Sequence, residues 1–175
     1  MLKQILVVLL VVVVGFLAYA STRPDTLRVQ RSATIKAPPD KIYPLITDLR
    51  RWSAWSPWEK KDPAMKRSFG GADSGKGAVY AWQGNRDVGE GRMEIVEATP
   101  PSKVAIQLDF IKPLEGHNVA EFTLTPRGEA TEVMWVMYGP TPFIGKMLGV
   151  FMNMDAMIGS DFEAGLASLK VAAEK

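Results

Sequence analysis

Side chains that could carry out acid–base chemistry are few in this chain of 175 residues. Glu90, Glu94, Asp109 and Glu121 fall in segments where polar and apolar residues alternate, as they do in β-strands. Two such carboxylates facing one cavity could act as acid and base, or could bind the polar head of a ligand. The alternation also fits the solvated face of a sheet, on which acidic residues are common. Only strands that turn these carboxylates inward would make them catalytic.

His117 is the only histidine, and the chain has no cysteine. The segment from Glu115 to Asn118 predicts a turn, so we expect a solvated histidine without a buried partner. A single imidazole and the lack of thiols exclude a disulfide, a cysteine nucleophile and the usual zinc sites. We therefore predict no catalytic residue, no metal and no cofactor, and the question of enzymatic activity stays open.

Large apolar side chains are better candidates for a binding function, because small-molecule pockets are mostly apolar. Methionine side chains also adapt to the shape of a ligand. The same residues could instead form an ordinary packed core. The expected ligand-binding residues are Trp58, Trp82, Met93, Phe110, Phe122, Trp135, Met154 and Ile158.

Three tryptophans, Trp52, Trp55 and Trp58, fall within seven residues and lie next to basic residues. They could form the aromatic rim of a cavity or touch lipid headgroups. Alternatively, buried indoles could pin this segment to the body of the protein. We favour this second interpretation for Trp52 and Trp55, since large aromatic residues mostly serve packing.

The spacing of apolar and polar residues along the sequence predicts the strands that position these side chains. Leu27 to Lys36 alternates as a strand, and Asp40 to Leu49 has its apolar residues at helical spacing. Further alternating segments are separated by glycine- and proline-rich turns, which predicts an antiparallel meander. These segments are Ala64–Phe69, Ala78–Gln83, Glu90–Ala98, Lys103–Ile111, Asn118–Thr125 and Thr131–Tyr138.

Towards the C-terminus the period changes from two residues to three or four. A short helical segment, residues 143–153, comes first, and a long helix follows it. We expect its apolar stripe to pack against the sheet. The stripe consists of Phe151, Met154, Ile158, Phe162, Leu166 and Leu169.

Residues Ile5 to Ala20 form an uncharged run dominated by valine, leucine and isoleucine. These sixteen residues would span about 24 Å as a helix, a little less than the hydrocarbon core of about 30 Å, and their polar flanks could make up the difference. The run predicts a single-pass anchor over residues 1–22 that contacts the membrane through residues 5–20. A cleaved secretory signal is the alternative, because Ala18-Tyr19-Ala20 matches a cleavage site.

The order of strand, short helix, meander and long helix resembles the START-like superfamily, also called SRPBCC or polyketide cyclase/dehydrase-like. Its most specific part is the opening strand followed by Ala37-Pro38-Pro39-Asp40. Trp55-Ser56-Pro57-Trp58 and Met152-Asn153-Met154-Asp155 are similar to a branch whose members often carry an N-terminal apolar helix. The resemblance covers residues 27–175. It implies an α+β helix-grip fold, in which a curved antiparallel sheet wraps around a long C-terminal helix and encloses a hydrophobic cavity.

Several functions are compatible with this resemblance, because the superfamily includes lipid carriers, polyketide cyclases, co-chaperones and hormone receptors. The net charge of +2 speaks against nucleic acid as a partner. We expect a domain at the cell membrane that binds a hydrophobic small molecule or a lipid. The alternatives are a cyclase or dehydratase that uses a cavity carboxylate, and a stress-related interaction module without a ligand. The charges around the apolar run do not decide on which side of the membrane the domain lies.

Overall fold

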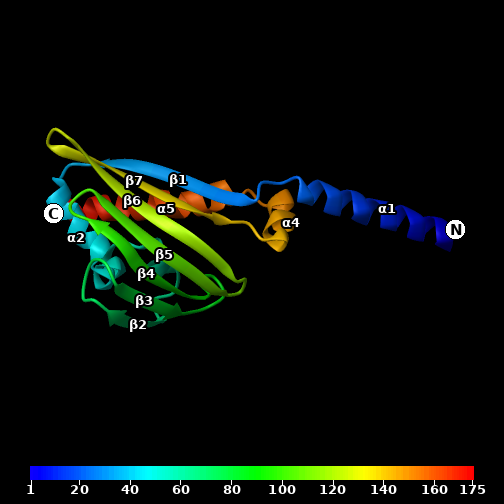
Figure 1. Ribbon diagram of the computed structural model, residues 1–175, viewed down its shortest axis with the longest axis horizontal. Helices are drawn as coiled ribbons and strands as arrows, with labels where there is room; N and C mark the ends of the chain where they lie inside the picture. The colour runs from blue at the N-terminus through cyan, green and yellow to red at the C-terminus, as the bar shows by residue number, and fades with distance from the viewer.

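A seven-stranded antiparallel sheet organises the computed structural model, which describes residues 1–175 (Figure 1). Strands β2 to β7 form a meander, and β1 completes the sheet by pairing with β7. The strands are β1 (Thr26–Ile35), β2 (Lys66–Gly71), β3 (Ala78–Gln83), β4 (Glu90–Thr99), β5 (Lys103–Lys112), β6 (Gly116–Arg127) and β7 (Ala130–Pro140). The helices are α1 (Leu2–Ser21), α2 (Pro39–Thr47), the 3-10 helix η1 (Leu49–Ala54), α3 (Pro57–Lys61), α4 (Phe143–Phe151) and α5 (Met154–Ala173).

Alternation of buried and more exposed residues along the strands gives the sheet an inner and an outer face. In β6, Asn118, Ala120, Phe122 and Leu124 are buried, whereas the residues between them are not. The buried sides of the strands form the inner face, which wraps around α5 (Figure 1). Every expected strand is present, with its ends within two residues of the prediction. The predicted α+β helix-grip fold is thus confirmed.

Helix α5 packs onto the inner face through Phe162, Leu166 and Leu169, which are buried as predicted. The sequence also places Phe151 in this stripe, and that prediction is wrong. The side chain of Asn153 caps a new helix by accepting a hydrogen bond from a backbone N–H (3.0 Å), so Phe151 ends α4 instead. The break between the helices turns Phe151 away from the sheet and leaves it 77% exposed.

Arg31 occupies an inward position of β1 and holds the strand to α5. Its guanidinium lies 2.7 Å from Glu163 and 3.0 Å from Asp155, both on α5. A glycine, Gly159, makes room for it, because a β-carbon there would lie only 2.0 Å from the guanidinium. Arg31 therefore links β1 to α5 without leaving a buried charge unpaired.

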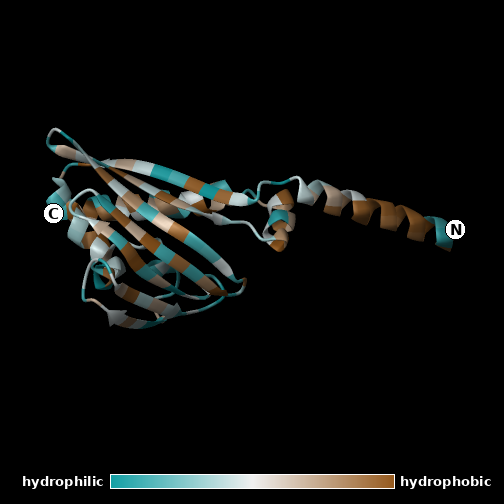
Figure 2. Cartoon of the chain, viewed as in Figure 1, coloured by the Kyte–Doolittle hydropathy of each residue, from teal (hydrophilic) through white to brown (hydrophobic).

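The helices α2 and η1 cover one end of the inner face (Figure 1). Their residues Ile42, Ile46 and Leu49 are buried in the core together with those of the strands. At the opposite end, α1 extends away from the body, and nearly all its side chains are exposed. Figure 2 shows α1 as a continuous hydrophobic helix, long and apolar enough to cross a membrane.

Candidate ligand-binding site

The apolar side chains of the inner face are buried at the α2 end. Several of those at the end nearest α1 are only half-buried and pack against the core. Three inner positions there, Gly91, Gly116 and Gly139, carry no side chain, and the Trp82 ring and the Asn118 amide occupy the space beside Gly91 and Gly139. We call the half-buried set the apolar mouth, and it consists of Leu27, Trp82, Leu108, Phe110 and Ile158.

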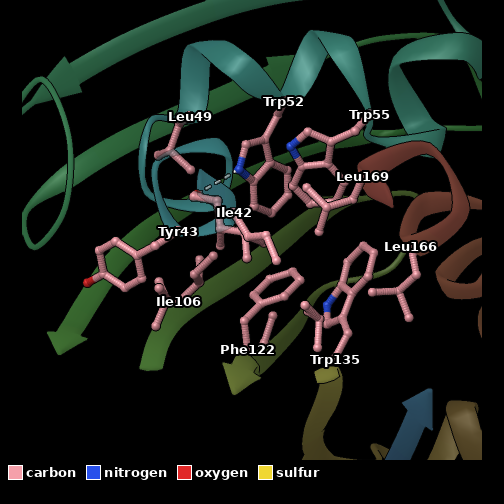
Figure 3. Packing of buried hydrophobic residues seen from close by; sticks show 14 of the residues in the cluster. Ile42, Tyr43, Leu49, Trp52, Trp55, Ile106, Phe122, Trp135, Leu166 and Leu169 are labelled. Carbon is pink, nitrogen blue, oxygen red and sulfur yellow. Dashed lines mark hydrogen bonds between the residues drawn. The ribbon is translucent and has the colours of Figure 1, made fainter. Parts of the chain in front are cut away.

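An aromatic cluster fills the middle of the grip, as Figure 3 shows for most of its members. The ring of Trp135 stacks on that of Phe162 with a centroid distance of 4.1 Å, and Phe122 lies 4.8 Å from Trp135. The indoles of Trp52 and Trp55 lie against both Phe122 and Trp135. This packing leaves no gap between the named rings, so any ligand must bind nearer to the mouth or displace them.

The indole N–H groups of Trp52 and Trp55 each donate a 2.9 Å hydrogen bond to a backbone carbonyl of α2, Ile46 and Leu45 respectively. Both tryptophans are buried, so they pin this segment to the body, as favoured from the sequence. Trp58 differs from them. It is half-buried, and its ring meets Trp135 edge-on at 5.8 Å.

The eight expected ligand-binding residues divide into two groups in the structure. Met93, Phe122 and Trp135 are buried in the core cluster. The others are half-buried, and they are Trp58, Trp82, Phe110, Met154 and Ile158. In the mouth, Trp82 and Phe110 meet edge-on at 6.2 Å, and the Trp82 ring lies over the bare α-carbon of Gly91.

Polar groups without a protein partner accompany this apolar surface. Asn118 is 9% exposed and points to the inner face, where its amide fills the space beside Gly139 and makes no hydrogen bond within the protein. The indole N–H of Trp135 is buried and also lacks an acceptor. An unpaired buried polar group costs about 1–3 kcal/mol. Sequence analysis missed Asn118, although a polar residue in the inward register of a strand was a usable signal.

A buried carboxylate, Glu59, was also missed, because nothing in its charged surroundings in the sequence distinguishes it. It accepts hydrogen bonds from the Tyr80 hydroxyl (2.7 Å) and from Arg67 (2.7 Å). Burial, together with the hydrogen bond to Glu59, raises the pKa of Tyr80. Both carboxylate oxygens are thus engaged, which suits a structural role better than proton transfer to a ligand.

The four carboxylates considered from the sequence all lie on the outer face, in ion pairs. Glu94 pairs with Arg92, Glu90 with Lys112, and Glu121 with Lys103; Asp109 lies beside His117. None of these four carboxylates points toward the inner face of the sheet. Within residues 1–175, no group of three or more histidine and acidic side chains could hold a metal ion.

His117 corrects a detail of the sequence analysis, because it begins β6 rather than lying in a turn, and it has a partner. Its Nδ1 atom lies 2.8 Å from the Asp109 carboxylate on β5, directly across the strand pair. This hydrogen bond raises the pKa of His117 and lowers that of Asp109. Since both groups are largely solvated, the pair adds little to stability.

We expect the pKa of His117 to lie above its ordinary value of about 6.5, and Asp109→Asn to bring it back. The pair stabilises the fold below that ordinary value and loses this contribution as the pH rises through the pKa of the folded state. Proton NMR measures it directly, since the chain has one histidine. Glu115→Gln is the control, because Glu115 lies 3.7 Å away and is the weaker influence. An unchanged pKa in Asp109→Asn would refute the pairing.

A hollow of about 590 Å³ lies on the outer face, near the end of the sheet from which α1 extends. Arg28, Gln107, His117, Val119 and Tyr138 surround it, and Leu27, Asn118 and Gly139 also line it. Its exposed surface is mainly apolar, but the hollow is open to solvent, whereas small-molecule sites bury most of the ligand. The inner face remains the better candidate site.

The fold and its aromatic inner face define a helix-grip domain of the START-like class. Residues 26–174 match the family described as polyketide cyclase/dehydrase and lipid transport, and the chain belongs to this family. No curated protein matches the sequence. This match confirms the resemblance to the START-like superfamily that the sequence indicated.

Solved structures with the same fold are distant in sequence. Protein CV1439 from Chromobacterium violaceum shares 16% identity at a TM-score of 0.60, over 87% of this chain and 99% of that one. The Aha1 dimer from Colwellia psychrerythraea shares 18% at a TM-score of 0.60, over 85% and 96%. The di-domain ARO/CYC BexL of the BE-7585A biosynthetic pathway shares 15% at a TM-score of 0.62, over 90% of this chain and 53% of that one. These identities establish the fold alone.

Proposed function

We propose that this protein is a membrane-tethered domain that binds a hydrophobic small molecule or a lipid at the apolar mouth. The observation that carries the proposal is the gradient along the inner face, which is packed at the α2 end and half-exposed at the α1 end. Aromatic and aliphatic side chains are the usual lining of a small-molecule site, and half-buried ones can contact a ligand. The proposed contacts are Trp58, Trp82, Phe110, Met154 and Ile158, with Met93, Phe122 and Trp135 behind them.

The tether is proposed because of how α1 joins the body. Only four residues, Thr22 to Asp25, separate α1 from β1. The last turn of α1 is part of the fold, since Ala20 is fully buried. The hydroxyls of Ser21 and Thr22 donate hydrogen bonds of 2.7 Å back to α1 carbonyls. A buried, helical Ala20 favours a retained anchor over cleavage after this residue, because cleavage would remove a packed part of the domain.

Asn118 would serve the polar part of such a ligand. Asn118 lies on the inner face of β6 beside Leu108 of the mouth, which is its neighbour across the strand pair. An amide offers both a donor and an acceptor. An amphiphilic ligand would place its apolar part against the mouth and its polar part at Asn118, whose amide has no hydrogen-bond partner within the protein.

A cyclase is the alternative, because the family of this chain is described as polyketide cyclase/dehydrase and lipid transport. Acid–base catalysis needs a titratable group within hydrogen-bond reach of the ligand. The carboxylate nearest to the inner face, Glu59, is engaged by Arg67 and Tyr80. Binding therefore explains the described geometry with fewer assumptions than catalysis.

The test is quenching of tryptophan fluorescence by a brominated fatty acid added to the full chain in non-ionic detergent. Trp58 and Trp82 border the site, so we expect saturable quenching. Ile158→Arg should weaken binding about tenfold or more, or about 1.4 kcal/mol, by placing a charge in the mouth. Ser160→Arg is the matched control, because Ser160 lies on the exposed side of α5.

The binding proposal fails if the parent chain shows no saturable quenching and native mass spectrometry finds no co-purified lipid. Equal affinities of Ile158→Arg and Ser160→Arg would place the site elsewhere. In the first case a protein-interaction module becomes the better account of the fold.

A further inference from the structure

We propose that α4 is an interfacial helix that lies in the headgroup region of the bilayer beside α1. The inference goes beyond binding at the mouth, but it rests on the tether proposed above. The surface concerned, the apolar α4 face, consists of Phe143, Ile144, Leu148, Phe151 and Met152, all of them exposed.

The polarity of α4 is inverted relative to that of a helix at a protein–water boundary. Its apolar residues point outward, and Ile144, Leu148 and Phe151 follow each other at helical spacing. Its only charged residue, Lys146, points inward, is 11% exposed and forms an ion pair with Asp25. Figure 2 shows the apolar residues of α4 next to those of α1. A helix with this pattern requires an apolar environment outside the protein.

Direct contact makes the apolar α4 face continuous with the surface of α1. The rings of Phe16 and Phe151 stack at a centroid distance of 5.5 Å. The Arg23 guanidinium donates a 3.0 Å hydrogen bond to the Gly149 carbonyl, which holds α4 at the end of α1. Lipid that surrounds α1 would therefore also meet α4.

The contact lies near the end of α1 that joins the body, where a membrane-spanning α1 would reach the headgroup region. Phe16 precedes the last residue of α1, Ser21, by five residues, which is about 7.5 Å along the helix axis. Amphipathic helices in the interface bury their apolar side to about 5–10 Å. Tyr19, exposed on α1 about 4.5 Å nearer to the body than Phe16, is typical of the aromatic residues found at membrane interfaces.

The direction of α4 fits the same position. In Figure 1, α4 runs crosswise to α1 at the point where α1 joins the body. If α1 crosses the bilayer, α4 then lies along its surface. Only Met152 and Asn153 separate α4 from α5, whose first turns carry Met154 and Ile158. The interfacial helix would thus hold the mouth close to the leaflet, which favours a ligand taken from the membrane.

The experiment uses the full chain in vesicles of phosphatidylcholine and phosphatidylglycerol, and the lack of natural cysteines permits single labels. An environment-sensitive fluorophore is attached to Leu148→Cys in α4, Leu10→Cys in the middle of α1, or Glu129→Cys in the distant β6–β7 turn. Lipids carry a nitroxide quencher either near the headgroup or near the bilayer centre. We expect the shallow quencher to act most on Leu148→Cys, the deep one on Leu10→Cys, and neither on Glu129→Cys.

Each other result is decisive. Quenching at Leu10→Cys with none at Leu148→Cys overturns the interfacial helix and leaves the tether intact. An absence of quenching at both positions overturns the tether as well. A Leu148→Cys label that is shielded from aqueous iodide but not reached by lipid quenchers, in a chain that cross-links to itself, means that a second copy covers α4.

Discussion

Phe162→Asp should lower the free energy of unfolding by about 4 kcal/mol or more, a large part of the 5–15 kcal/mol typical of a domain. Phe162 is 1% exposed, and its ring stacks on Trp135 and meets Trp58 edge-on. Loss of a buried phenylalanine costs about 3–5 kcal/mol by itself. A carboxylate in this aromatic surrounding has no cation in contact, which adds to the loss.

Urea denaturation of the full chain in mild detergent, followed by tryptophan fluorescence, measures this effect. Ala164→Asp is the control, because Ala164 lies on the exposed side of the same helix and introduces the same residue. We expect the control to stay within about 1 kcal/mol of the parent. Equal stability of the two variants would show that α5 does not grip the sheet through Phe162.

Replacing Val11 and Val12 together by arginine should release the chain from membranes. Both residues lie near the middle of α1, where the structure exposes them. Each arginine at the centre of a membrane helix raises the free energy of insertion by about 2.5–3.5 kcal/mol. Two arginines therefore offset most of the favourable insertion free energy of the apolar residues of α1. The parent should stay in the membrane pellet after a carbonate wash, and the double variant should move to the supernatant.

The control replaces the same two residues by leucine, which keeps α1 apolar and should leave the chain in the pellet. Sequencing the N-terminus of the parent from its host decides between an anchor and a cleaved signal. A chain that begins at Ser21 and washes off the membrane would remove the tether, and with it the basis for an interfacial α4.

The two groups of predicted ligand residues have different consequences for mutagenesis. Trp135 is packed between Phe122 and Phe162, so its substitution disturbs the core whether or not a ligand binds. Ile158 is half-buried at the mouth, where a substitution can change binding with less effect on folding. Mouth residues are therefore the informative positions for function, and cluster residues are the informative positions for stability.

The order and type of the elements could be predicted from the sequence because the signals for them are local. The alternation of β6 and the helical spacing of Phe162, Leu166 and Leu169 need only neighbouring residues to be recognised. The apolar run of α1 is evident in the same way. These patterns were sufficient to predict the order of strands and helices. The helix-grip fold and the family followed from the resemblance of this order, and of motifs such as Ala37-Pro38-Pro39-Asp40, to a known superfamily, and the comparison then established the family.

The position of each residue along the grip was decided only by the tertiary structure. Periodicity shows which side of a strand faces inward, but the location of the packed end depends on where α2 and η1 lie. Packing was favoured for Trp52 and Trp55 only because large aromatic residues usually pack, and the structure was needed to show that they are buried while Trp58 is half-buried.

The partners of polar groups depend on strand register and on contacts between distant segments. Asp109 meets His117 because β5 and β6 pair in one particular register. Glu59 is buried because α3 packs near Arg67 and Tyr80, and its sequence neighbours carry no sign of this. The spacing of Phe151 fits the apolar stripe of α5. However, a new helix begins after Asn153, and Phe151 contacts Phe16 of α1, so it belongs to the apolar α4 face. Periodicity is a property of one segment, whereas each of these outcomes requires two segments to meet.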